Sequence, residues 1–331
     1  MRNISWAILA SCVAMPAFTQ TSQTGPAQPL AFSNQSPIVL IYGLPSARGP
    51  QVLAQDKQEL NFTVDYTSHF IDRDNSVEDL ILDGETTRIA LNYRRGLGYG
   101  WEANIEIPFI DHSGGIADGF LDGFHDFTGF ADGGRDNGPR DRQLYRYIRN
   151  GETLLNVDDS PAGLGDIRLG AAKDLALSKT IQTSLNAQLK LPTGDAGKLT
   201  GSESTDFALW LTAGQANFLF DGFSIVGAAG GLYAGEGEVL ENQRVRGVGF
   251  GWLSLGYAWT ENFVTKAQLY VHSQLYDESR LTAVEGIAVQ GGAGFTWRFS
   301  QATEMDLSII EDLNAEASPD VTFSLALRQR F

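Results

Sequence analysis

Long segments in which apolar and polar residues alternate are the feature that most restricts what this chain of 331 residues can fold into. The alternation is clear from residue 58 onward, and two good examples run over 99–107 and 181–191. Successive side chains of a β-strand point to opposite faces, so one row of each segment lies on an apolar side and the other row on a polar side. The pattern therefore predicts an all-β chain.

The length of these segments separates two kinds of β protein. Each runs for about 10 to 14 residues, whereas strands of soluble sheets typically have five or six. Tilted strands that cross the hydrocarbon layer as part of a barrel need about 9 to 11 residues. We predict strands near 59–71, 80–93, 97–109, 164–174, 180–192, 205–216, 220–234, 248–260, 262–276, 286–299, 302–311 and 320–331.

The connections between the predicted strands alternate between long and short. The long joints are 72–79, 110–163, 193–204, 235–247, 277–285 and 312–319; the short ones are 94–96, 175–179, 217–219, 261 and 300–301. Bacterial outer-membrane barrels have short periplasmic turns, long outer loops and an even number of strands, whereas a soluble β-sandwich has no reason for such alternation. We therefore predict a transmembrane antiparallel up-and-down β-barrel of about twelve strands, over 58–331, in the cell outer membrane; merging or splitting one hairpin would give ten or fourteen.

The N-terminal residues are typical of an export signal. Arg2 precedes an apolar run over 4–15 that is too short to span a bilayer, and small residues follow. We predict a signal peptide at 1–19 and export in a Gram-negative cell. The run Leu9-Ala10-Ser11-Cys12 also resembles a lipobox, so lipidation of Cys12 stays open as an alternative. Cys12 is the only cysteine, so the mature chain would have neither an internal disulfide nor a thiol nucleophile.

The charge of the chain restricts its partners. A formal net charge of −16 argues against a nucleic-acid partner, because phosphate binding needs clustered lysine and arginine. We expect contact with the lipid bilayer and with lipopolysaccharide, and a small-molecule cargo that the sequence leaves undefined. The last alternating segment ends at Phe331, which resembles the strand that the barrel-assembly machinery reads by its C-terminal aromatic residue.

Two segments of the chain have candidate functional residues. Residues 20–57 form a periplasmic or luminal segment in this prediction, and 37–45 within it is either an extra strand or a piece inside the lumen. The polar rows would face the lumen, either as a selective pore or as a hydrogen-bonded filling, and we favour a narrow, partly plugged lumen. The lumen-lining candidates are Glu102, Glu106, Asn186, Gln188, Lys190, Lys266, Gln268 and His272.

The 110–163 joint is long enough to have a function of its own. Apolar residues at 116, 120, 124 and 127 predict a short helix that caps the barrel mouth. The cap candidates are His112, Ser113, Asp118, Asp122, His125 and Asp126. The last four are hard ligands, but their spacing matches no recognised metal site, so we expect neither a metal nor another cofactor. His112 and Ser113 are adjacent and would point to opposite faces of a strand, which disfavours a catalytic pair.

Several short motifs resemble known families. Asn34-Gln35-Ser36-Pro37, Tyr42-Gly43-Leu44-Pro45 and the stretch 112–127 resemble the uncharacterised proteobacterial family DUF3187, over nearly the whole mature chain. Leu191-Pro192-Thr193-Gly194-Asp195, followed by 201–206, is similar to transporter-like barrels of the phenol-degradation MetA-pathway family. Both resemblances imply an outer-membrane barrel and neither supplies a catalytic residue.

These observations together lead to one expected function and two alternatives. We expect a passive channel or small-solute transporter capped by the 110–163 loop. A lipid-active enzyme of the outer leaflet and a structural or surface-binding barrel are the alternatives.

Overall fold

A computed structural model describes residues 25–115, 141–313 and 317–331 of the chain. The predicted signal peptide, the predicted cap helix and four of the cap candidates (Asp118, Asp122, His125 and Asp126) lie outside these residues.

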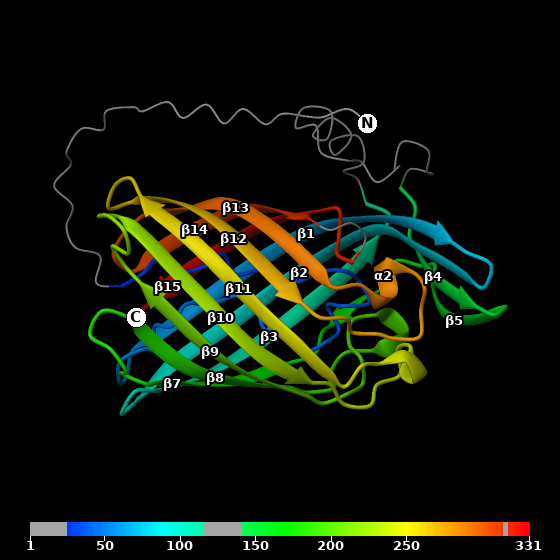
Figure 1. Ribbon diagram of the computed structural model, residues 1–331, viewed down its shortest axis with the longest axis horizontal. Helices are drawn as coiled ribbons and strands as arrows, with labels where there is room; N and C mark the ends of the chain where they lie inside the picture. Colours follow the sequence, from blue (N-terminus) through cyan, green and yellow to red (C-terminus); the bar gives the residue numbers. More distant parts are fainter. Residues whose placement is uncertain (1–24, 116–140, 314–316) are drawn as a thin grey trace.

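Twelve antiparallel strands close into a single barrel (Figure 1). Each strand pairs with its neighbour along the barrel, and β1 pairs with β15 over ten residues to complete the ring. This arrangement confirms the predicted fold class. The wall strands are β1 (Gln58–Asp74), β2 (Glu78–Gly98), β3 (Trp101–Ser113), β7 (Arg168–Asp174), β8 (Gln182–Lys190), β9 (Asp206–Gln215), β10 (Phe223–Tyr233), β11 (Gly247–Ala258), β12 (Phe263–His272), β13 (Ala288–Arg298), β14 (Thr303–Asp312) and β15 (Val321–Arg330).

Three further short strands lie within the long connection from β3 to β7. β4 (Leu144–Arg149) pairs with residues 78–83 of β2, β5 (Glu152–Val157) pairs with β4, and β6 (Ala162–Leu164) pairs with β3. β4 and β5 extend the wall beyond the long-loop end, on the right of Figure 1.

Two details of the predicted connections are wrong. The long joint at 72–79 is only the turn 75–77, because β1 and β2 continue past the rim, where Leu80 and Leu82 are buried in one cluster with Tyr145 and Tyr147. The turn at 94–96 lies instead at Tyr99–Gly100. Both residues of that turn have positive φ, 52° and 73°, as a tight hairpin turn of the right twist requires. The other joints keep the predicted alternation of long and short.

Helical structure in the described residues is confined to α2 (Thr282–Glu285) and to two 3-10 turns, Ala196–Lys198 and Glu241–Gln243. None of these is long and apolar enough to cross a membrane.

The two faces of the wall differ as membrane strands require. In β9 the outward residues Phe207, Leu209 and Leu211 are exposed, whereas inward Asp206 and Thr212 are buried. An apolar outer surface with a polar interior is the reverse of a soluble protein, and it fits a closed barrel in lipid, where every backbone group is paired within the wall.

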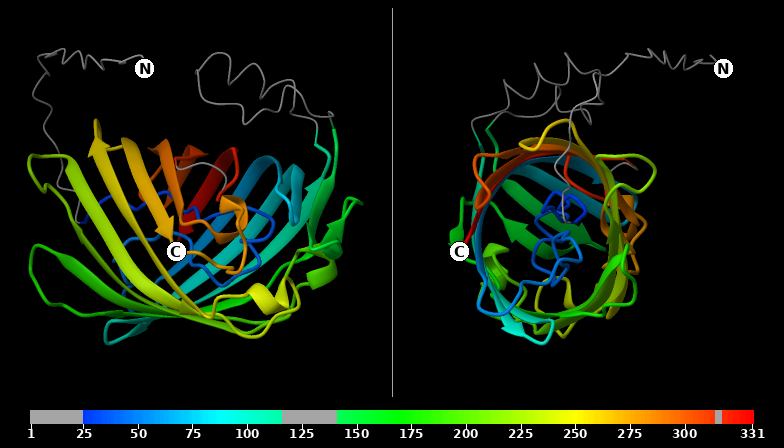
Figure 2. Two further views of the ribbon diagram at one scale, coloured as in Figure 1. Left: turned by 45° about the vertical axis from the view of Figure 1, so that its right-hand side comes forward. Right: turned by 90° about the vertical axis from the view of Figure 1, so that its left-hand side faces the viewer.

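The chain before β1 lies inside the barrel (Figure 2, right, blue). We call residues 25–57 the plug. It runs as a hairpin: Pro26 and Ala27 lie beside the short turns 217–222 and 258–262, while Tyr42 reaches the long-loop end, where its hydroxyl donates to the carbonyl of Leu275 at 2.9 Å. The chain then returns, and Asp56 bonds to the turn region of β2 through Gly96. Both limbs of the plug therefore reach the same end of the barrel.

Candidate functional site

We call residues 38–45 of the plug its tip. Side chains of the wall hold the tip by bonding to its backbone. Arg168 of β7 donates to the carbonyls of Leu44 and Tyr42, both at 3.2 Å, and more distantly to that of Leu40 at 3.5 Å. Gln188 donates to the carbonyl of Gly43 at 3.0 Å. These contacts satisfy backbone groups that would otherwise be buried without partners.

Three tyrosines add to this attachment. Tyr270 donates to the carbonyl of Pro45 at 2.8 Å and Tyr276 to that of Ile38 at 2.7 Å. Burial raises the pKa of Tyr276 to about 12, so its phenol keeps the proton that it donates. Burial likewise raises the pKa of Tyr42, whose ring lies edge-on to that of Tyr276 at 5.5 Å.

Asp206, at the start of β9, is the carboxylate that holds the tip. One of its oxygens accepts the N–H of Gly43 at 2.8 Å and lies 3.4 Å from Nζ of Lys190. The other accepts from Ser204 at 2.8 Å. Arg244 lies 3.9 Å from Asp206 and covers the ring of Tyr42, with 4.2 Å between the guanidinium carbon and the ring centroid. The residues around the tip thus form one buried network of charges.

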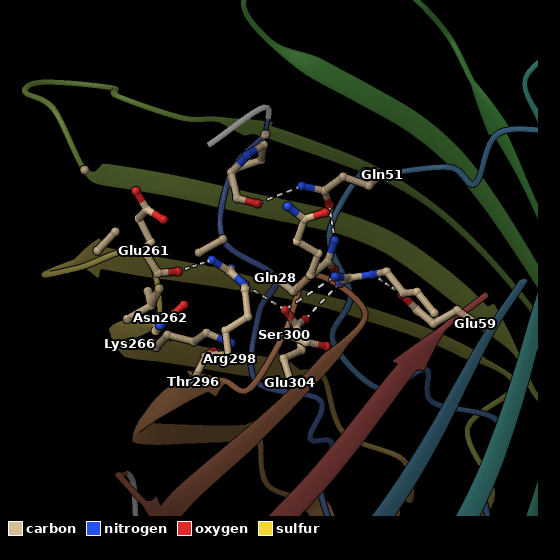
Figure 3. A pocket seen from close by; sticks show the side chains of 18 of the residues that line it. Gln28, Gln51, Glu59, Glu261, Asn262, Lys266, Thr296, Arg298, Ser300 and Glu304 are labelled. Atoms are coloured by element: carbon tan, nitrogen blue, oxygen red, sulfur yellow. Dashed lines mark hydrogen bonds and ion pairs between the residues drawn. The ribbon is translucent and has the colours of Figure 1, made fainter. Parts of the chain in front are cut away.

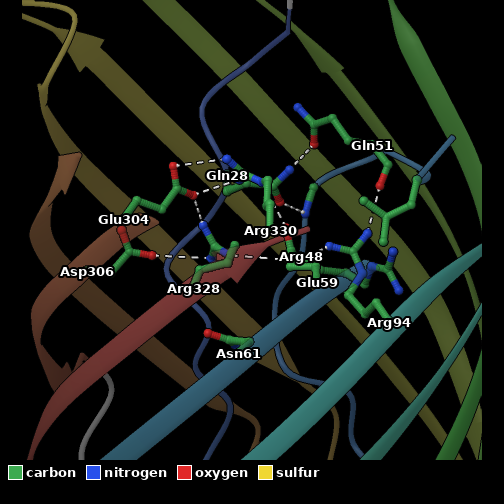
Figure 4. Close-up of polar contacts among 12 residues, drawn as sticks. Gln28, Arg48, Gln51, Glu59, Asn61, Arg94, Glu304, Asp306, Arg328 and Arg330 are labelled. Carbon is green, nitrogen blue, oxygen red and sulfur yellow. Dashed lines mark hydrogen bonds and ion pairs between the residues drawn. The ribbon is translucent and has the colours of Figure 1, made fainter. Parts of the chain in front are cut away.

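A second network of charges connects the plug to the short-turn half of the wall (Figure 4). Glu102 accepts from Arg48 of the plug at 3.0 Å, from Arg94 at 2.8 Å and from the N–H of Leu53 at 2.9 Å. Glu59 pairs with Arg94 at 2.5 Å and with Arg330 at 3.0 Å. Burial lowers the pKa of Arg48, as does the neighbouring Arg94, whereas Glu102 opposes the change.

This second network and the adjoining ion pairs of Arg88 and Arg168 have a small excess of positive charge, although the whole chain carries −16. The cations are Arg48, Arg88, Arg94, Arg168, Lys266, Arg298, Arg328 and Arg330, and the carboxylates are Glu59, Asp65, Glu102, Glu106, Glu304 and Asp306. The acidic excess of the chain therefore lies outside this part of the lumen, and the network by itself does not repel anions.

Two cavities follow this charged side of the lumen. The larger, of about 740 Å³, opens at the short-turn end between the plug and the turns, and Figure 3 shows Lys266, Arg298 and Glu304 at its wall. The smaller, of about 90 Å³, lies between the plug and β1–β3. Both are lined in part by Gln28, Glu59 and Arg94, so they are neighbouring sections of one polar seam.

Another part of the lumen wall is aromatic. Phe250 and Trp252 stack at 6.3 Å between ring centroids, and Trp252 stacks on Tyr270 at 6.0 Å with 5° between the ring planes. Trp210 packs against both Phe250 and Trp252 and also lines the smaller cavity, and Phe32 of the plug packs against Tyr270. The plug therefore contacts aromatic as well as charged residues of the wall.

All eight predicted lumen residues lie on the inner row, and most of them contact a partner rather than open space. Beyond the contacts given above, Glu106 binds Arg88 and Arg168, and Lys190 binds Asp166 at 2.5 Å. Lys266 pairs with Asp306, Asn186 bonds to Thr212, Gln268 to both backbone groups of Leu30, and His272 to Asn34. That these residues line a path for solutes stays a prediction.

The predicted set lacks the arginines and the tryptophans of the lumen. Arg88 and Arg94 belong to the polar row of β2, and Trp210 shares the row of Asp206 and Thr212. The position of each of these residues in the alternation therefore indicated that its side chain faces the lumen. Arg48 lies in a segment without alternation and had no such signal.

The side chain of His112 is held inside the barrel by hydrogen bonds and aromatic packing. It is fully buried; its Nδ1 bonds to Thr86 at 2.8 Å, its Nε2 to the carbonyl of Leu199 at 3.2 Å, and its ring lies edge-on to Tyr145 at 5.4 Å. Both nitrogens are thus engaged, and Ser113 is the next residue on the strand, directed to the other face. Within 25–115, 141–313 and 317–331 no three His, Cys, Asp or Glu side chains are grouped so that they could hold a metal ion.

The fold is similar to that of solved outer-membrane proteins. The COG4313 outer membrane channel from Pseudomonas putida F1 matches with a TM-score of 0.55 and 10% identity, over 85% of this chain and 97% of that one. The Ralstonia pickettii toluene transporter TbuX matches with a TM-score of 0.39 and 8% identity, over 84% and 90% of the two chains. At such identities the likeness concerns the fold alone.

Sequence comparison supports a family assignment. No curated protein matches the sequence. The model of one family, described as "Protein of unknown function (DUF3187)", matches residues 4–331. Because the match covers nearly every residue, including the plug and all twelve wall strands, the chain belongs to the DUF3187 family.

Proposed function

We propose that this protein is an outer-membrane channel or transporter for small solutes, in which the plug closes the lumen and opens it by withdrawing toward the short-turn end. In bacterial barrels that end faces the periplasm. The twelve-strand fold, the likeness to a solved outer membrane channel and the polar seam beside the plug support a channel.

One observation supports the gating step: residues 25–55 of the plug form no backbone-to-backbone hydrogen bond with the described part of the barrel, and only residues 56 and 57, which lead into β1, bond to the backbone of Gly96. The hydrogen bonds described between residues 25–55 and the barrel each use at least one side chain, and backbone-to-backbone bonds such as Ala47 N–H to Phe32 carbonyl stay inside the plug. Its two limbs also leave by the same mouth. Withdrawal would therefore break side-chain contacts and leave every strand pair of the wall in place.

The long loops, including the described part of 110–163, are proposed to cap and narrow the outer end without sealing it. Tyr147 of β4 donates to Glu78 at 2.6 Å, and Gln243, from the loop after β10, reaches both Tyr147 at 3.4 Å and the carbonyl of Asp277 at 3.1 Å. Three loops thus meet around one buried tyrosine.

The test is conductance in planar bilayers with the Asp206→Asn variant of the full chain. The asparagine keeps the shape of Asp206 but removes the charge that Lys190 and the N–H of Gly43 contact, so the tip of the plug is held less tightly. We expect low conductance for the wild type, with rare openings, and at least tenfold more open time for the variant.

Asp195→Asn is the matched control. It makes the same change of charge in the loop that leads into β9, but Asp195 is half-exposed and its ion-pair partner, Lys198, is 3.7 Å away. It should conduct like the wild type. Folded protein that never conducts in any of the three forms would rule out a channel, and equal open time in wild type and Asp206→Asn would rule out the plug as its gate.

A further inference from the structure

The wall that the plug tip contacts presents hydrogen-bond donors in the arrangement of a carboxylate site. Arg168 directs one terminal nitrogen at the carbonyl oxygen of Leu44 and the other at that of Tyr42, both at 3.2 Å. Each terminal nitrogen of Arg168 thus has one oxygen acceptor, and a carboxylate could supply both acceptors to the guanidinium fork. Tyr270 adds a third donor, to the carbonyl of Pro45.

An aromatic surface continues directly from these donors. Trp252 is stacked on Tyr270, and Trp210 lies edge-on to Trp252 with 6.3 Å between the ring centroids. Both tryptophans are only 4% exposed, and the indole N–H of each is buried with no hydrogen-bond partner in the described residues. An unpaired buried donor costs free energy, and two in one wall indicate a surface suited to a ligand that brings acceptors.

We propose that Arg168, Tyr270, Trp210 and Trp252 form a binding site for solutes that join a carboxylate to an aromatic or apolar body. In the closed channel the plug occupies this site. The tip places its carbonyl groups on Arg168 and Tyr270, and Phe32, earlier in the plug, lies against the ring of Tyr270. This inference specifies a class of solute for the channel. It rests on the proposed function, because a solute reaches the site only when the tip withdraws.

The charges around Arg168 are compatible with an anion. Its neighbour Glu106, 3.4 Å away, also binds Arg88 at 2.5 Å, so two guanidinium groups share this carboxylate. Arg88 has a second partner in Asp65 at 3.6 Å. A carboxylate ligand would thus replace the plug carbonyl groups on Arg168 while the existing ion pairs stay formed.

The test measures how fast a cysteine in the plug reacts with a water-soluble maleimide. Ala47→Cys places a thiol at a position that is 2% exposed, in the full chain with Cys12→Ser so that no other thiol reacts. Ser178→Cys, in the exposed turn between β7 and β8 and away from both cavities, is the control for direct effects on the reagent. The probes are 4-phenylbutyrate and its uncharged counterpart 4-phenylbutan-1-ol.

We expect 4-phenylbutyrate to accelerate labelling at position 47 at least tenfold, by competing with the tip, and 4-phenylbutan-1-ol to change it less than twofold. Arg168→Lys keeps the charge but not the fork and should reduce the acceleration to less than threefold. Labelling at position 178 should not respond to either compound.

Repeating the measurement with Asp206→Asn, in which the tip is released more often, separates the two proposals. If that variant labels faster but 4-phenylbutyrate adds nothing, or acts no better than the alcohol, the ligand site is wrong and the gated channel stands. If the variant neither labels faster nor conducts more than the wild type, the gated channel is wrong, whatever the carboxylate does.

Discussion

At the scale of single residues, the interior of this barrel is organised by buried polar groups that have partners. Lys190 is fully buried and binds Asp166, Asp206 and Ser202. His112 is buried just as deeply, with both ring nitrogens bonded. Burying such groups is costly unless their hydrogen bonds are complete, so each of them fixes the positions of its partners.

The structural role of His112 leads to a prediction about stability. His112→Ala would leave the Leu199 carbonyl and the Thr86 hydroxyl short of a partner, at a cost of about 1–3 kcal/mol in the free energy of unfolding. Ser113→Ala, at the neighbouring position that is only half-buried, should cost much less. Urea denaturation in lipid vesicles measures both. Loss of a lipid-hydrolysing activity in His112→Ala at unchanged stability would contradict the structural role and revive the enzyme alternative.

At the scale of elements, the strands that face the plug are fitted to it by small residues. Gly230 of β10 faces inward beside Trp210; a Cβ there would lie 2.3 Å from the Cβ of Trp210 and 2.4 Å from the carbonyl oxygen of Leu209. Gly292 of β13 faces Phe32 of the plug in the same way, with 2.5 Å from its Cβ position to a ring carbon. Glycine in these strands makes room for the aromatic residues of the lumen.

Two neighbouring glycines of β10 provide a matched test of that fit. Gly230→Ala must push β9 and β10 apart, because the clashing atoms of Leu209 and Trp210 are backbone atoms or Cβ, and we expect a loss of about 1–3 kcal/mol in the free energy of unfolding. Gly231→Ala faces outward, where the nearest atom to a Cβ is 3.8 Å away, and should be nearly neutral. The same denaturation measurement compares them. Equal effects would mean that strand propensity, rather than packing against Trp210, determines the cost.

At the scale of the whole molecule, the apolar row of each wall strand faces outward and the polar row faces the lumen, and this orientation determines which surroundings the barrel requires. The exposed apolar residues lie on the outer face of the wall strands, so the barrel needs lipid around it. The acidic excess of the chain lies outside the charged groups that surround the plug, because those groups have a small excess of positive charge.

The orientation can be tested with one substitution at two leucines. Leu211 of β9 is 55% exposed on the outer face, and Leu177 is 74% exposed in the short turn after β7. Leu211→Arg should lower the free energy of unfolding in lipid vesicles by about 2–4 kcal/mol, because the charge enters hydrocarbon. Leu177→Arg should leave it within 1 kcal/mol or so, because the charge stays in water. Equal losses at both positions would mean that the outer face does not contact lipid.

How far the sequence predicts this molecule depends on how local each feature is. The twelve strands and their alternating joints follow from a period of two residues and from turn composition, and both are readable in short windows. The turn at Tyr99–Gly100 was misplaced by a few residues because the alternation continues through it. The contact of Arg48 with Glu102 joins residues 54 positions apart, and only closure of the barrel around the plug brings them together. The segment 25–57 has no periodicity, so its place in the lumen could be proposed only as one of two options.

Because residues 25–55 of the plug form no backbone pairs with the described strands of the wall, the stability of the barrel and the retention of the plug in the lumen depend on different contacts. The barrel is held by its ring of paired strands, whereas the plug is held in the lumen by side-chain hydrogen bonds, ion pairs and apolar packing against the wall. A substitution that loosens the tip can therefore change how often the lumen empties while the melting of the barrel stays the same. If the plug is the gate, substitutions at these contacts would change the solute concentration to which the channel responds while the scaffold stays the same.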